Sequence, residues 1–140
     1  FMGTKQTEKM PQVAVGAIVF RKQHLLLVKR KFAPSKNKWA IPGGRIKWGE
    51  TLQKAAEREI FEETRIKIKA AEAVYVFDYI KRENGQDFHY VIIDLEAEYL
   101  SGELAAGDDA REVRWVAKDK ISEMELTAST RKLLKQKYNI

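Results

Sequence analysis

The sequence predicts one domain of mixed α and β structure, in which strands outnumber helices. The chain has 140 residues, a length typical of a single compact domain. Apolar residues make up 44% of it, enough for a core, and the charged residues, 33%, are mixed in sign, unlike those of a disordered tail. The β-rich segments and helical patterns follow one another in a mixed order, not as regular β-α-β units. We therefore expect a mixed α/β (α+β) fold.

The domain is expected to begin at residue 13. Residues 1–12 are mostly polar and lack a periodic pattern, so we interpret them as a flexible terminus or a cloning remnant, and residues 13–140 as the single domain. Val13–Phe20 reads V-A-V-G-A-I-V-F, which is typical of a buried strand, and Leu25–Val28 follows a short polar turn. Two strands joined by a short connection are predicted here.

A loop, a turn and the first helix come next. The loop covers residues 33–38, and after it Pro42-Gly43-Gly44 predicts a turn at which the backbone comes close to another group. Thr51–Thr64 contains good helix formers and neither Gly nor Pro. We therefore predict a helix over Thr51–Thr64.

The second half of the chain is mostly β-rich and closes with a helix. Residues 66–80 and 88–99 carry strand patterns, and Asn84-Gly85 between them is a strong hairpin signal. A short strand is predicted over residues 112–116 and a terminal helix over residues 129–138.

Composition and charge restrict the chemistry. Without cysteine the chain can form no disulfide, thiolate zinc site, iron–sulfur cluster or cysteine nucleophile, and with two histidines a metal would be held mainly by oxygen. The net charge of +6 favours anionic partners such as nucleotides, nucleic acid or anionic lipid. No apolar run approaches the ~20 residues of a membrane span, and no signal peptide is present, so a cytoplasmic protein is expected.

The predicted helix carries its carboxylates on its apolar side. Wound at about 100° per residue, Glu59, Glu62 and Glu63 share one stripe with Leu52 and two alanines. A Glu-rich helix is usually a solvated face, but such a face lies opposite the apolar stripe. These three carboxylates repel one another, and one arginine, Arg58, cannot neutralise them all. A divalent cation that prefers oxygen ligands, Mg²⁺ or Mn²⁺, would do so.

The same segment resembles a known family motif. The residues Gly44, Glu50, Arg58-Glu59-Ile60, Glu62-Glu63 and Ile66 match the Nudix box, G-x5-E-x7-R-E-U-x-E-E-x-G-U with U apolar, at every fixed position but one. The departure is Arg65, where the family has Gly. Arg65 must either adopt the left-handed conformation, at a cost of ~1 kcal/mol, or end the helix differently. The resemblance implies the Nudix fold, a mixed sheet between helices.

The resemblance also implies a reaction and a metal site. Nudix enzymes hydrolyse a pyrophosphate that links a nucleoside to another group, with Mg²⁺ as cofactor and Mn²⁺ as a substitute. By position in the box, Glu59, Glu62 and Glu63 resemble the metal ligands, and the Gly43 carbonyl resembles an additional ligand.

Catalytic roles follow from the same resemblance. Glu50 resembles the supporting carboxylate, and Arg58 would hold the carboxylates in place. The general base stays open among Glu50, Glu59 and the later carboxylates Asp108, Asp109 and Glu112, with Glu112 ranked first of the later three because a strand follows it directly.

Candidates for substrate binding are cationic and aromatic. Arg30 and Arg45 are predicted to contact phosphates, and Tyr79 or Phe88 to stack on a base. Lys31, Phe32, Lys81 and Arg82 are further candidates.

Three functional hypotheses remain. The sequence looks most like small ADP-ribose-pyrophosphatase-type members, which favours ADP-ribose or another nucleotide sugar as the substrate. The alternatives are a house-cleaning nucleoside triphosphatase that releases pyrophosphate, and a non-catalytic domain that senses nucleotides or binds nucleic acid. On the first hypothesis the partner is a small nucleotide, with neither membrane nor nucleic acid involved, and a homodimer is plausible because related small members often form dimers.

Overall fold

A computed structural model describes residues 9–140 and shows one seven-stranded mixed sheet. Five strands follow the order β3-β2-β1-β6-β5, while β4 pairs with β1 and β7 with β2. The pair β1·β6 is parallel and the others are antiparallel. The strands are β1 (Gln12–Arg21), β2 (His24–Arg30), β3 (Trp39–Ala40), β4 (Gly43–Arg45), β5 (Lys67–Glu83), β6 (Gln86–Ser101) and β7 (Ala110–Ala117).

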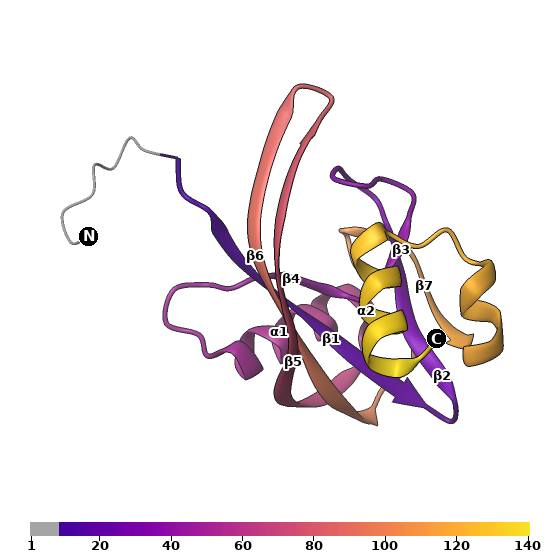
Figure 1. Ribbon diagram of the computed structural model, residues 1–140. Helices are drawn as coiled ribbons and strands as arrows, with labels where there is room; N and C mark the ends of the chain where they lie inside the picture. Colours follow the sequence, from indigo (N-terminus) through magenta and orange to yellow (C-terminus); the bar gives the residue numbers. More distant parts are fainter. Residues whose placement is uncertain (1–8) are drawn as a thin grey trace.

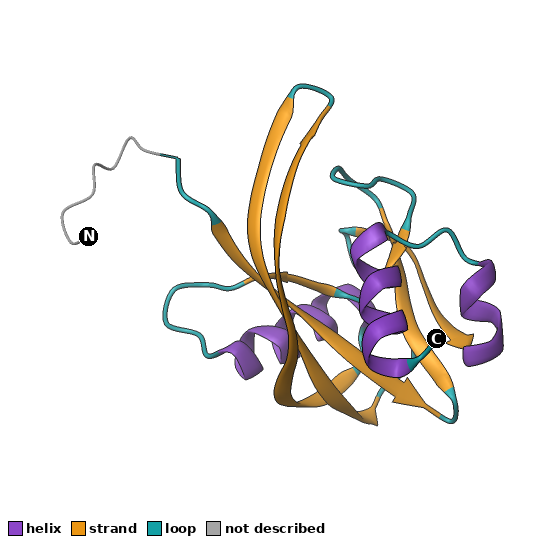
Figure 2. Cartoon of the chain, viewed as in Figure 1, coloured by secondary structure: helices purple, strands orange, loops and turns teal. Residues whose placement is uncertain are grey.

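The sheet lies between two helices, which confirms the predicted fold class (Figures 1 and 2). Helix α1 (Leu52–Thr64) packs its small residues Ala55 and Ala56 on Val15 and Leu95. Helix α2 (Ala128–Tyr138) covers the other face, where its leucines join a larger apolar cluster with β1 and β2. Alternate residues of a strand point to opposite faces, so β1 and β6 supply both layers.

The first helix forms where the sequence predicts it. Thr51 is its N-cap, and the Thr51 hydroxyl oxygen accepts a hydrogen bond from the Lys54 backbone N–H at 3.1 Å. At the other end Arg65 has φ 66° and ψ 13°, and its N–H donates to the Phe61 carbonyl at 2.9 Å. The chain thus takes the first of the two predicted alternatives, a left-handed arginine where the family has glycine, at a cost of ~1 kcal/mol.

The hairpin predicted at Asn84-Gly85 is also confirmed. Strands β5 and β6 pair in antiparallel register from Lys67↔Ser101 to Glu83↔Gln86, and Asn84 and Gly85 have φ values of 51° and 78° at the turn. Asn and Gly tolerate positive φ, which two-residue hairpin turns require. The tip of this hairpin projects beyond the rest of the sheet (Figure 1).

Three short elements were not predicted. They are β3, β4 and the 3-10 helix η1 (Lys118–Glu123). The predicted turn at Gly43-Gly44 is largely strand β4, in which Gly43 pairs with Gly16 and Gly44 with Val15. The close backbone approach predicted there is present, because a Cβ at Gly43 would collide with the Val15 carbonyl oxygen.

Strand β1 begins at Gln12, one residue before the predicted start of the domain, and the rest of the expectation for residues 1–12 falls mainly on residues 1–8, which lie outside the described part. Across residues 9–140, none of the helices combines the length and the apolar character that a membrane crossing requires.

Candidate active site

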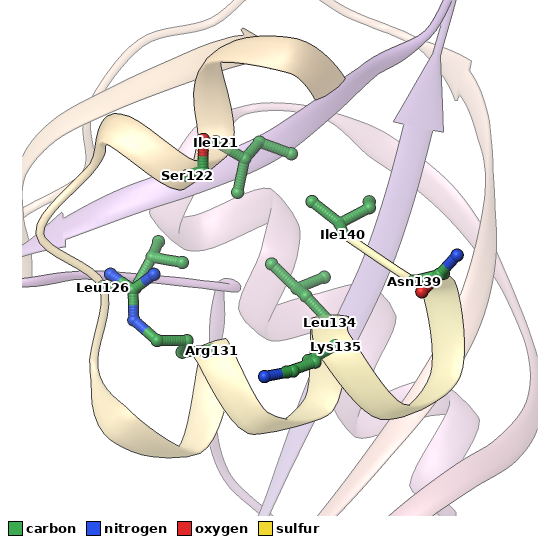
Figure 3. Close-up of a pocket in the computed structure, with 8 residues that line it drawn as sticks. All are labelled: Ile121, Ser122, Leu126, Arg131, Leu134, Lys135, Asn139 and Ile140. Carbon is green, nitrogen blue, oxygen red and sulfur yellow. The ribbon is translucent and has the colours of Figure 1, made fainter.

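One large cleft gathers most of the predicted site residues. Its volume of about 820 Å³ lies within the range of small-molecule sites. It is lined by β1, β4, the loop after β2, the inner side of α1, the β5–β6 hairpin and the start of α2. A smaller hollow of about 290 Å³ lies between η1 and α2, where Arg131 and Lys135 are its charged lining residues (Figure 3). None of the predicted site residues lines that second hollow, so the large cleft is the candidate site.

Pairing of β4 with β1 brings the Gly-Gly segment against α1. The Gly43 N–H donates to Glu63 Oε1 at 3.1 Å, and a Cβ at Gly44 would collide with the Glu59 carboxylate. Gly43, Gly44, Glu59 and Glu63 all line the cleft. The two glycines therefore let the backbone lie directly on the carboxylates of the helix.

Glu63 is the most perturbed of these carboxylates. Burial raises its pKa to about 7, and the nearby charges of Glu59 and Asp109 raise it further. The Gly43 hydrogen bond and the charge of Arg30 oppose that shift. A carboxylate whose charge is this costly is poised to bind a cation.

Arg58 is the centre of a hydrogen-bonded network. Its Nε and Nη2 bind the two oxygens of Glu50 at 2.7 and 2.8 Å, and its Nη1 binds Glu59 at 2.8 Å and Glu62 at 3.3 Å. Nη2 also donates to the Arg45 carbonyl at 3.0 Å. The arginine holds the pKa of Glu50 down at about 2, helped by the Lys47 N–H. Arg58 thus fixes three carboxylates relative to α1 and β4.

The loop before β7 docks on the end of α1. The Ala105 N–H donates to the Thr64 carbonyl at 3.1 Å, and the Gly107 N–H donates to the Glu63 carbonyl at 2.8 Å. These bonds satisfy carbonyls that the end of a helix leaves free. They also bring Asp109 into the cleft wall.

The other predicted residues divide between the cleft and the outside. Arg30, Lys31, Phe32, Arg45 and Tyr79 line the cleft. The residues that do not line it are Glu50, Arg58, Glu62, Lys81, Arg82, Phe88, Asp108 and Glu112.

Glu112 and Phe88, two of these outer residues, contact side chains of their own strands. Glu112 lies on β7 and pairs with Arg114, whereas Phe88 lies nearer the hairpin tip, with its ring centroid 6.4 Å from that of Tyr90. Asp109, and not Glu112 or Asp108, is therefore the later carboxylate that the structure brings beside Glu63.

Several lining residues were not singled out from the sequence. They include Asp94, Phe77 and Tyr90 on the hairpin, and Thr127 and Thr130 at the start of α2. One signal could have identified the first: the run V-I-I-D-L places a single carboxylate inside an otherwise apolar strand. The aromatic residues carry no such signal, because a strand aromatic is usually a core residue.

The donor set fits a divalent cation. Among the described residues no three carboxylate or imidazole groups converge into a closed cage. Mg²⁺, however, usually keeps several waters and takes one or two carboxylates together with substrate phosphates. Glu59 and Glu63, which line the cleft beside Gly43, meet that requirement. Glu62 lies outside the cleft lining and accepts a hydrogen bond from Arg58.

Comparison with known proteins identifies the family of this chain. The NUDIX domain family matches residues 10–137. The ADP-ribose pyrophosphatase of Methanocaldococcus jannaschii is 38% identical over 107 residues, which are 75% of this chain and 61% of that protein. A putative 8-oxo-dGTP diphosphatase of Bacillus subtilis is 32% identical over 107 residues, which are 76% of this chain and 66% of that one. The chain thus spans about two thirds or less of the length of these two relatives.

A solved structure extends the match to the whole fold. The MutT NUDIX hydrolase from Burkholderia pseudomallei has a TM-score of 0.80 and 36% identity, covering 92% of this chain and 99% of that chain. The expected mixed sheet between helices is therefore the arrangement that a Nudix enzyme has. Since the family matches nearly the whole chain, and Gly44, Glu59 and Glu63 of the box line one cleft, this protein belongs to the Nudix hydrolase family.

Proposed function

We propose that the protein hydrolyses, with Mg²⁺, the pyrophosphate linkage of a nucleoside diphosphate joined to a second group, with ADP-ribose as the favoured substrate. The observation that carries the proposal is the single cleft in which Glu59 and Glu63 share a wall with cationic and aromatic side chains. The relative from Methanocaldococcus jannaschii, named as an ADP-ribose pyrophosphatase, supports this choice of substrate.

On this proposal Glu59 and Glu63 would hold the cation, with Glu62 and the Gly43 carbonyl as further ligands. The bound cation supplies charge neutralisation at the pyrophosphate and a more acidic water. Mn²⁺ is the expected substitute, because it accepts the same oxygen ligands.

The rest of the chemistry belongs to the chain's own side chains. Arg30, Lys31 and Arg45 line the cleft and would bind the phosphates of the substrate. Arg58 keeps Glu50 and Glu59 oriented through the hydrogen bonds described above. This positioning reduces the cost of ordering the site when the substrate binds.

The general base would be a carboxylate in reach of the attacking water. Of the three later candidates, Asp109 lines the cleft and Glu112 is paired with Arg114 outside it, so Asp109 replaces Glu112 as the first choice. Glu59 lines the cleft as well and stays a candidate. Exchange of Asp109 for Asn, with Asp108→Asn as the matched control, separates the two neighbouring aspartates.

One observation favours a second candidate function. The Bacillus subtilis relative is named a putative 8-oxo-dGTP diphosphatase, and the same cleft would admit a nucleoside triphosphate. Both reactions would use the same box residues, so the box does not distinguish them.

A substrate panel with product identification tests the proposal. ADP-ribose, other nucleotide sugars, dinucleoside polyphosphates, NADH and nucleoside triphosphates are each incubated with Mg²⁺, and the products are separated by chromatography. We expect ADP-ribose to yield AMP and ribose 5-phosphate. Release of pyrophosphate from triphosphates alone would establish the second candidate, and no turnover with Mg²⁺ or Mn²⁺ would favour a nucleotide-sensing domain.

The remaining family expectations are proposals of the same kind. We expect a small nucleotide as the partner, a cytoplasmic location and a homodimer. Light scattering on the purified protein measures its mass in solution and so tests the dimer directly.

A further inference from the structure

Asp94 is a buried carboxylate for which the fold supplies no partner. It lies on β6 between Ile93 and Leu95, and only 3% of its surface is exposed. Within residues 9–140 the side chain makes no hydrogen bond or ion pair. Burial raises its pKa to about 7, with no opposing contribution from a neighbour. A buried polar group without a partner costs stability, so its presence calls for an explanation.

The space around this carboxylate is left open by a glycine. Asp94 pairs with Gly16 in the parallel β1·β6 register, and a Cβ at Gly16 would lie 2.5 Å from Asp94 Oδ1. The same Cβ would lie 3.0 Å from Ile41. Any larger residue at position 16 would therefore displace the carboxylate or the isoleucine.

The carboxylate is not sealed inside the protein. Within residues 9–140 every fully buried side-chain oxygen or nitrogen has a hydrogen-bond partner, so the unpartnered Asp94 carboxylate retains access to solvent. Asp94 lines the large cleft, which supplies that access.

The neighbouring walls are apolar and aromatic. Ile92 and Phe77 pair across β5 and β6, two positions along the strands from the pair of Asp94 with Tyr75, and both line the cleft together with Ile41. Flat apolar walls beside an unpartnered carboxylate suit a heterocycle that carries an N–H group.

The register also fixes the distance to the reacting end. Gly16 lies on β1, between its two neighbouring strands. It pairs with Asp94 of β6 on one side and with Gly43 of β4 on the other. Two strand spacings put the Asp94 and Gly43 backbones about 10 Å apart. The Gly43 N–H binds Glu63, so both ends lie within the span of one nucleotide.

We propose that Asp94 is a specificity-determining residue, which accepts a hydrogen bond from an amino group of the substrate's nucleobase. The inference rests on the proposed function, because it takes a nucleotide as the occupant of the cleft. It adds the element of selection: Asp94 distinguishes a base with an amino group at this position from one without it.

Binding of matched nucleotide pairs tests this without turnover. AMP is compared with purine riboside 5′-monophosphate, and GMP with IMP, since each pair differs only in one amino group. Affinities are measured by calorimetry in Mg²⁺ for the intact chain and for Asp94→Leu, which keeps the forked shape of the side chain, is larger, and cannot accept a hydrogen bond. In one of the pairs we expect a preference of roughly 10- to 100-fold for the amino compound, reduced to near onefold by Asp94→Leu.

Two further variants keep the test decisive. Asp94→Asn retains an acceptor and serves if Asp94→Leu does not fold, and it should reduce the preference only partly. Asp78→Asn changes an exposed aspartate on β5, one residue from Phe77 and Tyr79 but outside the cleft, and should leave the preference unchanged.

The outcomes separate the two proposals. A preference below about threefold in both pairs, or one that persists in Asp94→Leu, would overturn the role of Asp94. Failure of the intact chain to hydrolyse ADP-ribose would contradict the proposed function instead, and the binding comparison would still decide the role of Asp94.

Discussion

The carboxylates at the α1 end of the cleft have hydrogen-bond partners, whereas the carboxylate at the β6 end has none among the described residues. At the α1 end Arg58 binds Glu50, Glu59 and Glu62, and a backbone N–H binds Glu63. At the β6 end Asp94 is more deeply buried than these carboxylates and has no partner in the described chain. A carboxylate with partners is oriented in advance, whereas one without partners is completed only by a ligand. On our two proposals, the first end serves the chemistry and the second selects the substrate.

The largest expected effect is at Glu63. Exchange for Gln removes a charge from the proposed cation site but keeps the size of the side chain, so we expect kcat/KM to fall at least about 100-fold with the fold intact. Turnover of ADP-ribose measures the fall in kcat/KM, and a circular dichroism spectrum checks that the fold is intact. Glu57→Gln is the matched control, because Glu57 is on the same helix but binds the Ala70 N–H. Activity near that of the unmodified protein in Glu63→Gln would contradict the site assignment.

The next effect concerns the network rather than the ligands. Arg58→Lys keeps the positive charge but cannot bind both oxygens of Glu50 and also reach Glu59. We expect kcat/KM to fall about 10- to 100-fold, mainly through kcat, because the carboxylates lose their fixed orientation. Arg45→Lys tests whether loss of any nearby arginine does the same; its guanidinium binds only Gln12 among the described residues, so a change in KM is expected there. Equal effects on kcat in both variants would contradict a positioning role for Arg58.

At the other end of the cleft the expected effect is on stability and depends on pH. The pKa of Asp94 is about 7 in the fold, against an ordinary value of 3.8, so the folded state holds its proton more tightly than the unfolded state. Stability from this group is therefore complete below about pH 4 and is lost as the pH rises to about 7. On the same face Tyr138 binds Glu96 at 2.9 Å, so those two groups already have partners.

Asp94→Asn removes that titration. At pH 7 we expect this variant to unfold at a higher temperature than the unmodified protein, with a free energy of unfolding that is larger by at most about 4 kcal/mol. Near pH 4 the two proteins should be equally stable. Thermal unfolding at the two pH values, without nucleotide, measures it. A lower unfolding temperature for Asp94→Asn at pH 7 would show that the carboxylate stabilises the fold.

The smallest effect is expected at Arg65. Glycine adopts the left-handed conformation without the steric cost that arginine meets at φ 66°. Arg65→Gly should therefore raise the free energy of unfolding by up to about 1 kcal/mol, reduced by loss of the arginine's contact with Phe61. Turnover should not change. Denaturant unfolding checks the first expectation, and a clear loss of stability would mean that the Arg65 contacts outweigh the strain.

The parts of the fold that were predicted have strong local signals. Thr51 to Thr64 is a continuous run of helix formers, and Asn84-Gly85 specifies a hairpin by its own backbone preferences. Strand β4 has no such signal, since Gly-Gly-Arg has little strand propensity and is held by pairing with β1. Its position depends on residues far away in the sequence.

The site shows the same division. Helical spacing put Glu59, Glu62 and Glu63 on one face of α1; Glu59 and Glu63 line the cleft, whereas Glu62 does not. The choice between Asp109 and Glu112 depends on a loop that docks through the Gly107 N–H on the Glu63 carbonyl. The position of Asp94 beside Gly16 depends on strand register, which the sequence of one strand does not determine.

One assay compares both ends of the cleft directly. The unmodified protein, Glu63→Gln and Asp94→Leu are each given ADP-ribose and its analogue with purine in place of adenine, and kcat/KM is measured for both compounds with Mg²⁺. If adenine is the base that Asp94 selects, Glu63→Gln should lose both activities to the same extent, and Asp94→Leu should lose activity on ADP-ribose while it keeps that on the analogue. Equal losses on both compounds in Asp94→Leu, or full turnover in Glu63→Gln, would contradict the division of the cleft into a reacting end and a selecting end.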